Sequence, residues 1–530
     1  MRKYLTATLV AGVAASAVLS GAAYAQTKAP LSILRVIDAD NYDPIRSTAT
    51  AMVEVMAMLG DTLVSLDFDM KTVKPGLAEA WSVSEDGKTY TFSLRKDVKF
   101  CDGRPMTAAD VVYTIERWQN PEKRSPTAFR GGKVKSVTAK DDYTVIYELE
   151  EPYSDLLPQL TMPFSTIVDK ATVEKLGENF GVQGFNGTGP YCWVSWQPRQ
   201  ELKLKKNPNY TWGPSFYKNP SPQVDEIVWR VIPEANTLMA AIQARQADMT
   251  YYMPPIALTT MESMPGINVS KQENYIYDMF MGFKIDKPVV SDPIIRKAVN
   301  MATNKAAITQ AVYFGHGKEM KSLVNPAIID FDPESAKLMP AFDQDAANKM
   351  LDEAGWKMGG DGIREKDGQK ATFLVYGLRN ATNPTVSEAM QADLRKIGID
   401  MKIQLWDATV GWGKMATQEF DAFYMNYPAL TALEAIGLYF PSRQAPTPNR
   451  MNWKDPATDE LIRKAATTTS KEERHEALAT LQRNLTEANV WVTLSSEPMW
   501  LISGDRVEGA KAHGIYGAGI YKGLDISLKR

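Results

Sequence analysis

The second half of this chain alternates strand-like and helix-like stretches in the order that a parallel sheet requires. An apolar run at 371–376 is followed by a helical pattern at 385–396 and by a second apolar run at 401–405. This switch of apolar period is typical of a βαβ unit, whose two strands lie parallel in one sheet. We therefore expect a doubly wound α/β lobe here, with further helices at 294–301 and 346–354.

The first half is richer in strand-like runs than in helices. A helix is predicted at 51–59, another from Thr107, and a third at 236–245. No flexible Pro/Gly-rich tether separates the halves, and a mature chain of about 500 residues is long enough for two or three lobes. We expect the lobes to be joined by strands. The predicted strands are 31–37, 62–66, 88–94, 134–138, 143–149, 202–205 and 226–231, with a long helix at 471–488 and a strand at 490–494 near the end.

The first 25 residues are typical of an export signal. Met1, Arg2 and Lys3 give a positive start, residues 4–19 are mostly apolar, and Ala23-Tyr24-Ala25 is a signal-peptidase site. A retained membrane anchor is the alternative, but the apolar core is shorter than the roughly 20 residues of a spanning helix. We expect cleavage after Ala25, a periplasmic location, and no lipid anchor because no Cys lies near the cleavage site.

The charge and the metal-binding residues exclude several classes of function. Sixty basic and sixty-three acidic residues are interspersed and give a formal net charge of -3, which does not favour nucleic acid or a polybasic membrane patch. Three His and two Cys residues show no zinc-site spacing, and no cofactor is expected. Cys101 and Cys192 either form a disulfide in the oxidising compartment or remain free.

Residues 76–117 carry the most specific pattern in the chain. Asp86-Gly87 supplies a tight hairpin turn, and Asp102-Gly103 leads into a helix capped by Thr107 with Asp110 three residues on. The characteristic residues are Gly76-Leu77-Ala78-Glu79-Ala80-Trp81, Asp86-Gly87-Lys88-Thr89-Tyr90-Thr91-Phe92, Leu94-Arg95, Val98-Lys99-Phe100, Asp102-Gly103, and Thr107-Ala108 with Asp110-Val111-Val112.

This series resembles the signature of the peptide/nickel family of extracellular solute-binding proteins of ABC importers, which includes dipeptide- and oligopeptide-binding proteins. Later blocks resemble the family in the same order along the chain. They are Gly187-Thr188-Gly189-Pro190-Tyr191 with Trp196, then Asn207-Pro208 with Tyr210, then stretches within 281–300, 351–356 and 391–399.

The resemblance implies a two-lobed periplasmic-binding-protein fold of type II (the large, cluster C type) that closes around a solute. Lobe one spans residues 26–277 with an extra subdomain at about 67–185. Lobe two spans residues 278–498, and residues 499–530 return to lobe one. The implied partners are a peptide-like ligand that can carry a carboxylate and an inner-membrane permease. The protein is expected to be a monomer.

Arg379 is the first candidate ligand contact. It follows the predicted strand 371–376 and precedes a helix, and ligands of open α/β sheets bind at such strand ends. In dipeptide-binding members an Arg in a similar stretch pairs with the ligand carboxylate, which suits a planar guanidinium. A solvated loop Arg is the alternative.

The acidic residue that takes a peptide's amino group in the family is missing here. Where the family carries Asp-Pro-Asp, this chain has Asn426-Tyr427-Pro428. Asn426 in a neighbouring place or Glu434 from the following helix are possible substitutes. A desolvated amine without a carboxylate is costly, so this departure argues against an ordinary dipeptide.

Aromatic residues near the same strand ends are further candidates. Trp406 ends the strand 401–405, and Tyr424 and Tyr427 lie close by in sequence, where flat rings stack on ligands. Thr188 and Gly189 are candidate contacts from the other lobe. For each of these residues, the alternative to a ligand contact is packing in the protein core.

Three classes of function remain to be compared. A solute-binding protein for a short peptide or amino-acid-derived solute is the first, with an opine, a glycoside or a metal chelate as other ligands. A secreted hydrolase would need a catalytic motif, and no Gly-x-Ser-x-Gly, partnered Ser-x-x-Lys or His-Glu-x-x-His spacing is present, so we do not expect an enzyme. A periplasmic chaperone or sensing role is the third.

Overall fold

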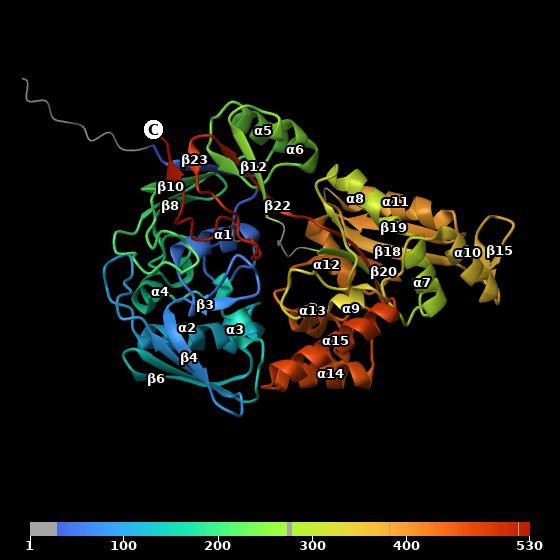
Figure 1. Ribbon diagram of the computed structural model, residues 1–530, viewed down its shortest axis with the longest axis horizontal. Helices are drawn as coiled ribbons and strands as arrows, with labels where there is room; N and C mark the ends of the chain where they lie inside the picture. Colours follow the sequence, from blue (N-terminus) through green and yellow to red (C-terminus); the bar gives the residue numbers. More distant parts are fainter. Residues whose placement is uncertain (1–28, 273–277, 381, 518, 530) are drawn as a thin grey trace, which may run out of the picture.

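The computed structural model describes residues 29–272, 278–380, 382–517 and 519–529, which form two lobes side by side (Figure 1). The predicted signal peptide at 1–25 lies outside the described residues. Within the described ranges, no helix has the length and apolar character needed to cross a membrane. We call residues 29–272 with 499–529 lobe one, and residues 278–496 lobe two.

Lobe one is built on a seven-stranded sheet in the order β12-β22-β11-β1-β10-β9-β8. Strand β1 runs parallel to β10 and β11, and the other pairs are antiparallel. The strands are β1 (Leu31–Arg35), β8 (Tyr191–Gln197), β9 (Glu201–Lys206), β10 (Glu226–Val231), β11 (Met249–Thr250), β12 (Ile267–Gln272) and β22 (Met499–Gly504).

Helix α1 (Thr50–Leu59) lies in the middle of lobe one. Every residue from Ala51 to Leu59 is buried, because Met, Val, Ala and Leu side chains surround the helix on all sides. A helix that is apolar all round packs inside a core. The exception is Glu54, a carboxylate at 1% exposure in the centre of the helix. Helices α5 (Ala235–Gln243) and α6 (Pro255–Glu262) cover the lobe near β12.

A four-stranded antiparallel sheet in the order β4-β5-β7-β6 forms a subdomain of lobe one. Tyr90, Phe92 and Leu94 of β5 are buried in its core, whereas the residues between them are more exposed. The elements of this part of the chain are β2 (Val64–Leu66), β3 (Val73–Pro75), β4 (Ala78–Val83), β5 (Thr89–Leu94), α2 (Ala108–Gln119), β6 (Val134–Asp141), β7 (Thr144–Leu149), α3 (Leu156–Gln159) and α4 (Lys170–Leu176).

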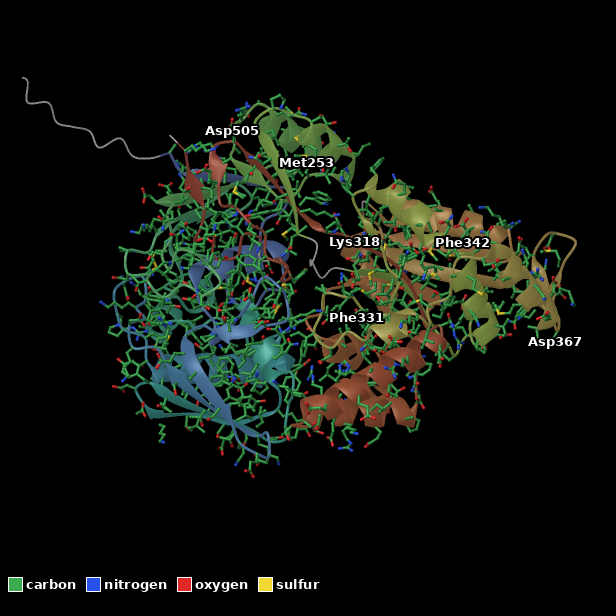
Figure 2. The ribbon with its side chains drawn as sticks, in the orientation of Figure 1. Met253, Lys318, Phe331, Phe342, Asp367 and Asp505 are labelled. Atoms are coloured by element: carbon green, nitrogen blue, oxygen red, sulfur yellow. A yellow bond between two sulfur atoms is a disulfide. The ribbon has the colours of Figure 1, made fainter. Side chains whose placement is uncertain are left out.

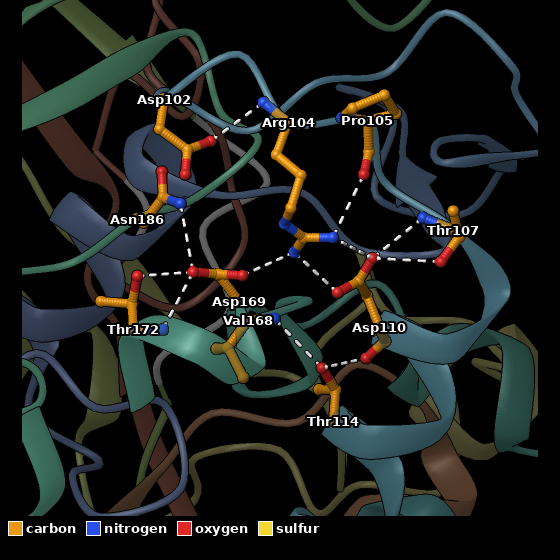
Figure 3. Close-up of polar contacts among 10 residues, drawn as sticks. All are labelled: Asp102, Arg104, Pro105, Thr107, Asp110, Thr114, Val168, Asp169, Thr172 and Asn186. Atoms are coloured by element: carbon orange, nitrogen blue, oxygen red, sulfur yellow. Dashed lines mark hydrogen bonds and ion pairs between the residues drawn. The ribbon is translucent and has the colours of Figure 1, made fainter. Parts of the chain in front are cut away.

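The predicted helix cap at Thr107 is confirmed and belongs to a larger polar network (Figure 3). The Thr107 backbone N–H donates to Asp110 Oδ2 at 2.9 Å. Arg104 donates to Asp110 at 2.8 Å and to Asp169, whose carboxylate also accepts from Asn186 at 3.2 Å. One guanidinium therefore joins the start of α2 to the start of α4.

Cys101 and Cys192 form a disulfide across a sequence separation of 91 residues. Cys101 follows β5, and Cys192 lies in β8 of the seven-stranded sheet. The bond therefore attaches the subdomain to the main sheet of lobe one.

Lobe two is built on a six-stranded mixed sheet in the order β14-β21-β13-β20-β18-β19. Its strands are β13 (Asp278–Phe283), β14 (Lys318–Glu319), β18 (Thr372–Leu378), β19 (Asp400–Trp406), β20 (Ala422–Tyr427) and β21 (Trp491–Ser496). Strands β18 and β19 pair in parallel and are connected through α11 (Asn383–Arg395). The predicted βαβ unit is confirmed.

Helices cover lobe two and the end of the chain returns to lobe one. The remaining elements are α7 (Pro293–Ala302), α8 (Lys305–Tyr313), α9 (Pro333–Ala336), α10 (Gln344–Glu353), β15 (Lys357–Met358), β16 (Arg364–Lys366), β17 (Gln369–Lys370), α12 (Ala408–Ala416), α13 (Ala432–Tyr439), α14 (Pro456–Thr467), α15 (Lys471–Glu487), β23 (Val507–Glu508) and β24 (Ser527–Leu528).

The chain passes between the two large sheets twice. It leaves lobe one after β12 and enters lobe two at β13, and it returns from β21 to β22 through Glu497 and Pro498. In lobe one β12 pairs with β22, and in lobe two β13 pairs with β21. The two crossings therefore begin and end on neighbouring strands, and we call the ends of β12, β13, β21 and β22, together with Glu497 and Pro498, the hinge.

Candidate functional site

A cavity of about 590 Å³ lies between the lobes, and we call it the interlobe cavity. Lobe one contributes Asp69 and Lys71, and lobe two contributes most of the remaining wall. Figure 2 shows Lys318 and Phe331 on the side of lobe two that faces lobe one. A cavity of this size fits a small solute. The lobe-two lining consists of Lys318, Glu319, Met320, Lys321, Ser322, Asn325, Pro326, Ala327, Ala336 and Ser496.

A second cavity of about 220 Å³ lies in lobe one beside the hinge, and we call it the hinge cavity. Its wall contains four aromatic residues, and its charged residues are Glu54 and Glu497. The ring of Trp500 meets His316 of lobe two edge to face at 5.1 Å, so the cavity borders the interface between lobes. Its lining consists of Thr50, Glu54, Tyr251, Tyr252, Met253, Glu497, Pro498, Met499, Trp500, Tyr516, Gly517 and Gly519.

Glu54 reaches the hinge cavity from the centre of α1. Its Oε1 accepts a hydrogen bond from Trp229 Nε1 at 2.6 Å. Its Oε2 is buried and has no hydrogen-bond partner among the described residues. Burial raises the pKa of Glu54, and the nearby Arg35 guanidinium opposes that rise. A buried acceptor without a donor is unfavourable, so this oxygen is suited to a donor from outside the chain.

Glu497 reaches the same cavity from the hinge itself. Burial raises the pKa of its carboxyl to about 7. Asp278, at the other hinge connection, has its pKa raised to about 7 by the same cause. The two differ in their partners, because Asp278 accepts a hydrogen bond from Asn325 at 2.7 Å and Glu497 makes no hydrogen bond or ion pair within the described part of the chain.

The lobes also touch through a buried ion pair. Arg130 of the subdomain lies 2.6 Å from Glu434 of α13 in lobe two, and both side chains are at most 8% exposed. Glu434 also accepts from Gln159 of lobe one at 3.0 Å and from the Tyr427 hydroxyl at 3.1 Å. Arg130 and these donors already occupy the Glu434 carboxylate, which argues against Glu434 as a substitute for the family's ligand-binding acid.

A second ion pair joins the lobes close by. Arg474 of α15 lies 2.6 Å from Asp155 in lobe one and 2.6 Å from Asp330 in lobe two. Asp155 also accepts from the Thr431 hydroxyl at 2.7 Å. Helices α3 and α15 lie on the side of the lobes away from β22 (Figure 1). The hinge and this distal contact therefore hold the lobes together at opposite ends.

Arg379 and Trp406 lie together at the carboxyl ends of β18 and β19. The Arg379 N–H donates to the Trp406 carbonyl at 2.7 Å. The Arg379 side chain is exposed, and its Nε lies 4.0 Å from the Asp407 carboxylate. Trp406 is half-buried, with its ring edge-on to Tyr376 at 5.8 Å and the Lys414 ammonium 5.1 Å from its centroid. The exposed Arg379 guanidinium is able to bind a planar anion.

The three predicted residues of β20 have different surroundings. Asn426 and Tyr427 are half-buried at the end of the strand, and Tyr427 lines a small cavity against Tyr439. Tyr424 is 3% exposed, and its hydroxyl contacts the Met390 sulfur at 3.4 Å. Tyr424 therefore belongs to the core of lobe two, which corrects its assignment as a ligand contact.

Thr188 and Gly189 belong to the core of lobe one, which corrects their assignment as ligand contacts. The Thr188 side chain is fully buried, and its hydroxyl donates to Asp61 Oδ2 at 2.9 Å. A Cβ at Gly189 would lie 2.2 Å from the Met58 carbonyl oxygen. Both residues are thus required for close packing against α1 and the segment that follows it.

Sequence reasoning did not select Glu54 or Glu497. The available signal for Glu54 was a single charged residue within the apolar run 51–59. The signal for Glu497 was an acid followed by Pro498 directly after the apolar run 490–494. Neither pattern indicates that the two side chains reach one cavity. The described residues contain no group of three or more His, Cys, Asp or Glu side chains that could hold a metal ion.

Comparison with known proteins gives matches over most of the chain. The model of bacterial extracellular solute-binding proteins, family 5 Middle, matches residues 72–437. The oligopeptide-binding protein AppA of Bacillus subtilis (strain 168) is 26% identical over 482 residues, which cover 89% of this chain and 87% of that protein. The dipeptide-binding protein of Escherichia coli (strain K12) is 29% identical over 393 residues, which cover 67% of each.

A solved structure shares the whole fold. The crystal structure of NikA from Brucella suis, in complex with Fe(III)-EDTA, superposes with a TM-score of 0.82 at 24% identity. The match covers 94% of this chain and 99% of that one. The predicted α/β fold of type II periplasmic binding proteins is confirmed.

Proposed function

Because this chain belongs to family 5 of the bacterial extracellular solute-binding proteins, we propose that it captures a short peptide or an amino-acid-derived solute between its lobes. It then delivers the solute to the membrane permease of an ABC importer. Relatives named as oligopeptide- and dipeptide-binding proteins support a peptide-like ligand.

The observation that carries this proposal is a cavity with walls from both lobes, next to two hinge connections. A solute there touches lobe one and lobe two at once only when the lobes are together. Contacts made in one state alone shift the population toward that state. Capture by hinge closure follows from this arrangement.

The further solute contacts that we propose in lobe two are Arg379, Trp406, Asn426 and Tyr427, which lie outside the lining of the interlobe cavity. Arg379 pairs with a carboxylate of the solute, and Trp406 stacks on a flat group. Asn426 and Tyr427 border the place where peptide-binding relatives carry their acid. An opine, a glycoside or a metal chelate is the second candidate ligand, favoured by the absence of that acid.

We further infer that the protein performs no chemistry on its solute and acts as a monomer. It is exported to the periplasm after cleavage at Ala25. The family's role in binding substrates for transport supports the first inference, and the apolar segment at 4–19 supports the export.

The proposal is tested by native mass spectrometry of the mature chain purified from the periplasm of its own host. The expected result is a mass increment of one small solute per chain, which is lost when the protein unfolds. A chain that carries no solute and retains none from a set of tripeptides contradicts capture of a peptide.

A further inference from the structure

The hinge cavity presents two carboxylates that have no counter-ion in its wall. Glu54 is 1% exposed, and its Oε2 makes no well-formed hydrogen bond within the described residues, although the Tyr251 and Tyr252 hydroxyls lie near its carboxylate. Glu497 has no hydrogen bond or ion pair with any part of the chain that the structure describes. The described lining contains no Lys, Arg or His. The cavity therefore holds two carboxyl groups with unused acceptors, and burial raises the pKa of both.

Two cations of the chain, Arg35 and Lys271, lie near the hinge cavity without lining it. The Arg35 guanidinium forms an ion pair with Asp38 and donates to the Tyr42 hydroxyl at 2.7 Å. The Arg35 guanidinium also attracts the Glu54 carboxylate, but it forms no ion pair with Glu54 and is not part of the cavity lining. The Lys271 ammonium lies 5.3 Å from the ring centroid of Trp500.

Aromatic rings complete the wall around the carboxylates. Tyr251 and Tyr252 have ring centroids 6.1 Å apart and planes at 70° to each other. Trp500 closes another side of the cavity, next to Met499. Electron-rich ring faces attract a cation, and rings at steep angles to each other surround one better than a flat stack does.

We propose that the hinge cavity binds a primary ammonium or guanidinium group of the captured solute, with Glu54 and Glu497 as acceptors and Tyr251, Tyr252 and Trp500 as walls. A group with N–H donors is required, because the free oxygen of Glu54 needs a hydrogen bond as well as a positive charge. A cavity of about 220 Å³ holds the charged end of a solute and not a whole tripeptide.

This inference rests on the proposed function and explains the acid that is missing from lobe two. Peptide-binding relatives take the amino group with an acid near the position of Asn426, whereas here the free carboxylates lie across the hinge in lobe one. The solute's charged nitrogen is thus held by lobe one, and its carboxylate is left for Arg379 of lobe two.

A bound cation changes the protonation of Glu497. Burial raises the pKa of the empty carboxyl to about 7, so a good part of it is protonated at neutral pH. A cation nearby favours the charged form and lowers that pKa. Binding therefore releases a fraction of a proton near pH 7.

The experiment uses the mature chain and tripeptides Ala-Xaa-Ala in which Xaa is Ala, Leu, Ser, Tyr or Lys. One set has free amines, one is acetylated at every amine, and in a third Ala-Lys-Ala is acetylated at the amino terminus alone. Binding is measured by calorimetry at pH 7 in phosphate and in Tris, which differ in their ionisation enthalpies. The variants are Glu497→Gln, Glu54→Gln and, as a control, Glu508→Gln, whose carboxylate pairs with Lys529 on the surface.

Free-amine peptides are expected to bind at least tenfold more tightly than fully acetylated ones. The third set separates an amino terminus from a basic side chain as the source of the cation. Glu497→Gln is expected to lose at least tenfold in affinity and to reduce the buffer dependence, and Glu508→Gln to behave as wild type. If Glu54→Gln does not fold, Glu497→Gln still decides the question, because its side chain is only half-buried.

The outcomes separate the two proposals. Equal binding of free and acetylated peptides overturns the cation site and leaves peptide capture intact. Binding that depends on the amine but not on Glu497 also overturns this site. Failure of every peptide to bind overturns the proposed peptide ligand and, with it, this inference.

Discussion

Arg130 and Glu434 form a buried ion pair at 2.6 Å across the interface between the lobes. Arg130 lies between α2 and β6 of the subdomain, and Glu434 lies in the first turn of α13. Neither charge is buried in this way unless the lobes are together. The pair therefore contributes to the closed arrangement rather than to the folding of either lobe alone.

Replacing Glu434 with Gln should weaken closure. In this variant the Arg130 guanidinium has no counter-ion when the lobes are closed, but water hydrates it when they open. The substitution therefore raises the free energy of the closed state and leaves the free energy of folding nearly unchanged. We expect solute affinity to fall about tenfold, which is about 1.4 kcal/mol, with little change in the melting temperature. Calorimetry with the Ala-Xaa-Ala tripeptides measures the affinity, and the exposed Glu476→Gln on α15 is the matched control. Unchanged affinity in Glu434→Gln would show that this contact is present in the open state as well.

Thr188→Val should lower stability and leave solute affinity unchanged. The hydroxyl lost is a buried donor to Asp61, and removing it leaves that carboxylate one hydrogen bond short. A loss of about 1–3 kcal/mol of unfolding free energy is expected from such a change. Denaturant unfolding measures it, with Thr138→Val on the exposed side of β6 as the control. A variant with normal stability and weakened binding would return Thr188 to the ligand site.

Removing the disulfide should destabilise lobe one. Cys101 and Cys192 close a loop across 91 residues, and the chain-entropy estimate for a loop of that length is about 4–5 kcal/mol. The double variant Cys101→Ser/Cys192→Ser is expected to unfold at lower denaturant than wild type. Reduction of the wild-type chain should give a similar shift. Equal midpoints for oxidised and reduced wild type would contradict the prediction.

His513 should make the protein less stable as the pH falls below neutral. The ring is fully buried against Leu66 and Phe68, and burial lowers its pKa to about 4. The unfolded state therefore binds a proton at a higher pH than the folded state does. The contribution of His513 to the unfolding free energy is complete above pH 6.5 and is lost as the pH falls toward 4. Each unit of difference between the folded and unfolded pKa is worth about 1.4 kcal/mol, so the unfolding free energy falls by about 3 kcal/mol.

The pH dependence of the unfolding free energy of His513→Asn, compared with wild type, isolates this contribution. We expect a shallower decline between pH 6.5 and 4 in the variant, whatever its absolute stability. Parallel curves for the two proteins would contradict the assignment.

The sequence predicted most elements because their signals are local. The βαβ unit of β18, α11 and β19 followed from a change of apolar period, and the Thr107 cap followed from residues three positions apart. Such patterns depend on neighbours along the chain, and secondary structure forms from the same neighbours.

The candidate site was harder to predict because its geometry depends on contacts between distant segments. Arg379 and Trp406 were predicted from strand ends that lie side by side in one parallel sheet. Thr188 and Tyr424 carry hydroxyl groups of the kind that bind ligands. Only their burial, with contacts to Asp61 and Met390, shows that these hydroxyls belong to the core. The meeting of Glu54 with Glu497 joins positions more than 400 residues apart, which no local pattern encodes.

The central claim is that the two lobes close around a solute. Small-angle X-ray scattering of the mature chain, with and without saturating tripeptide, tests it most directly when occupancy is verified on the same sample by native mass spectrometry. We predict that the radius of gyration decreases with solute and that the decrease saturates at the concentration at which binding saturates. Superimposable scattering curves for the empty and the fully occupied protein would contradict the claim.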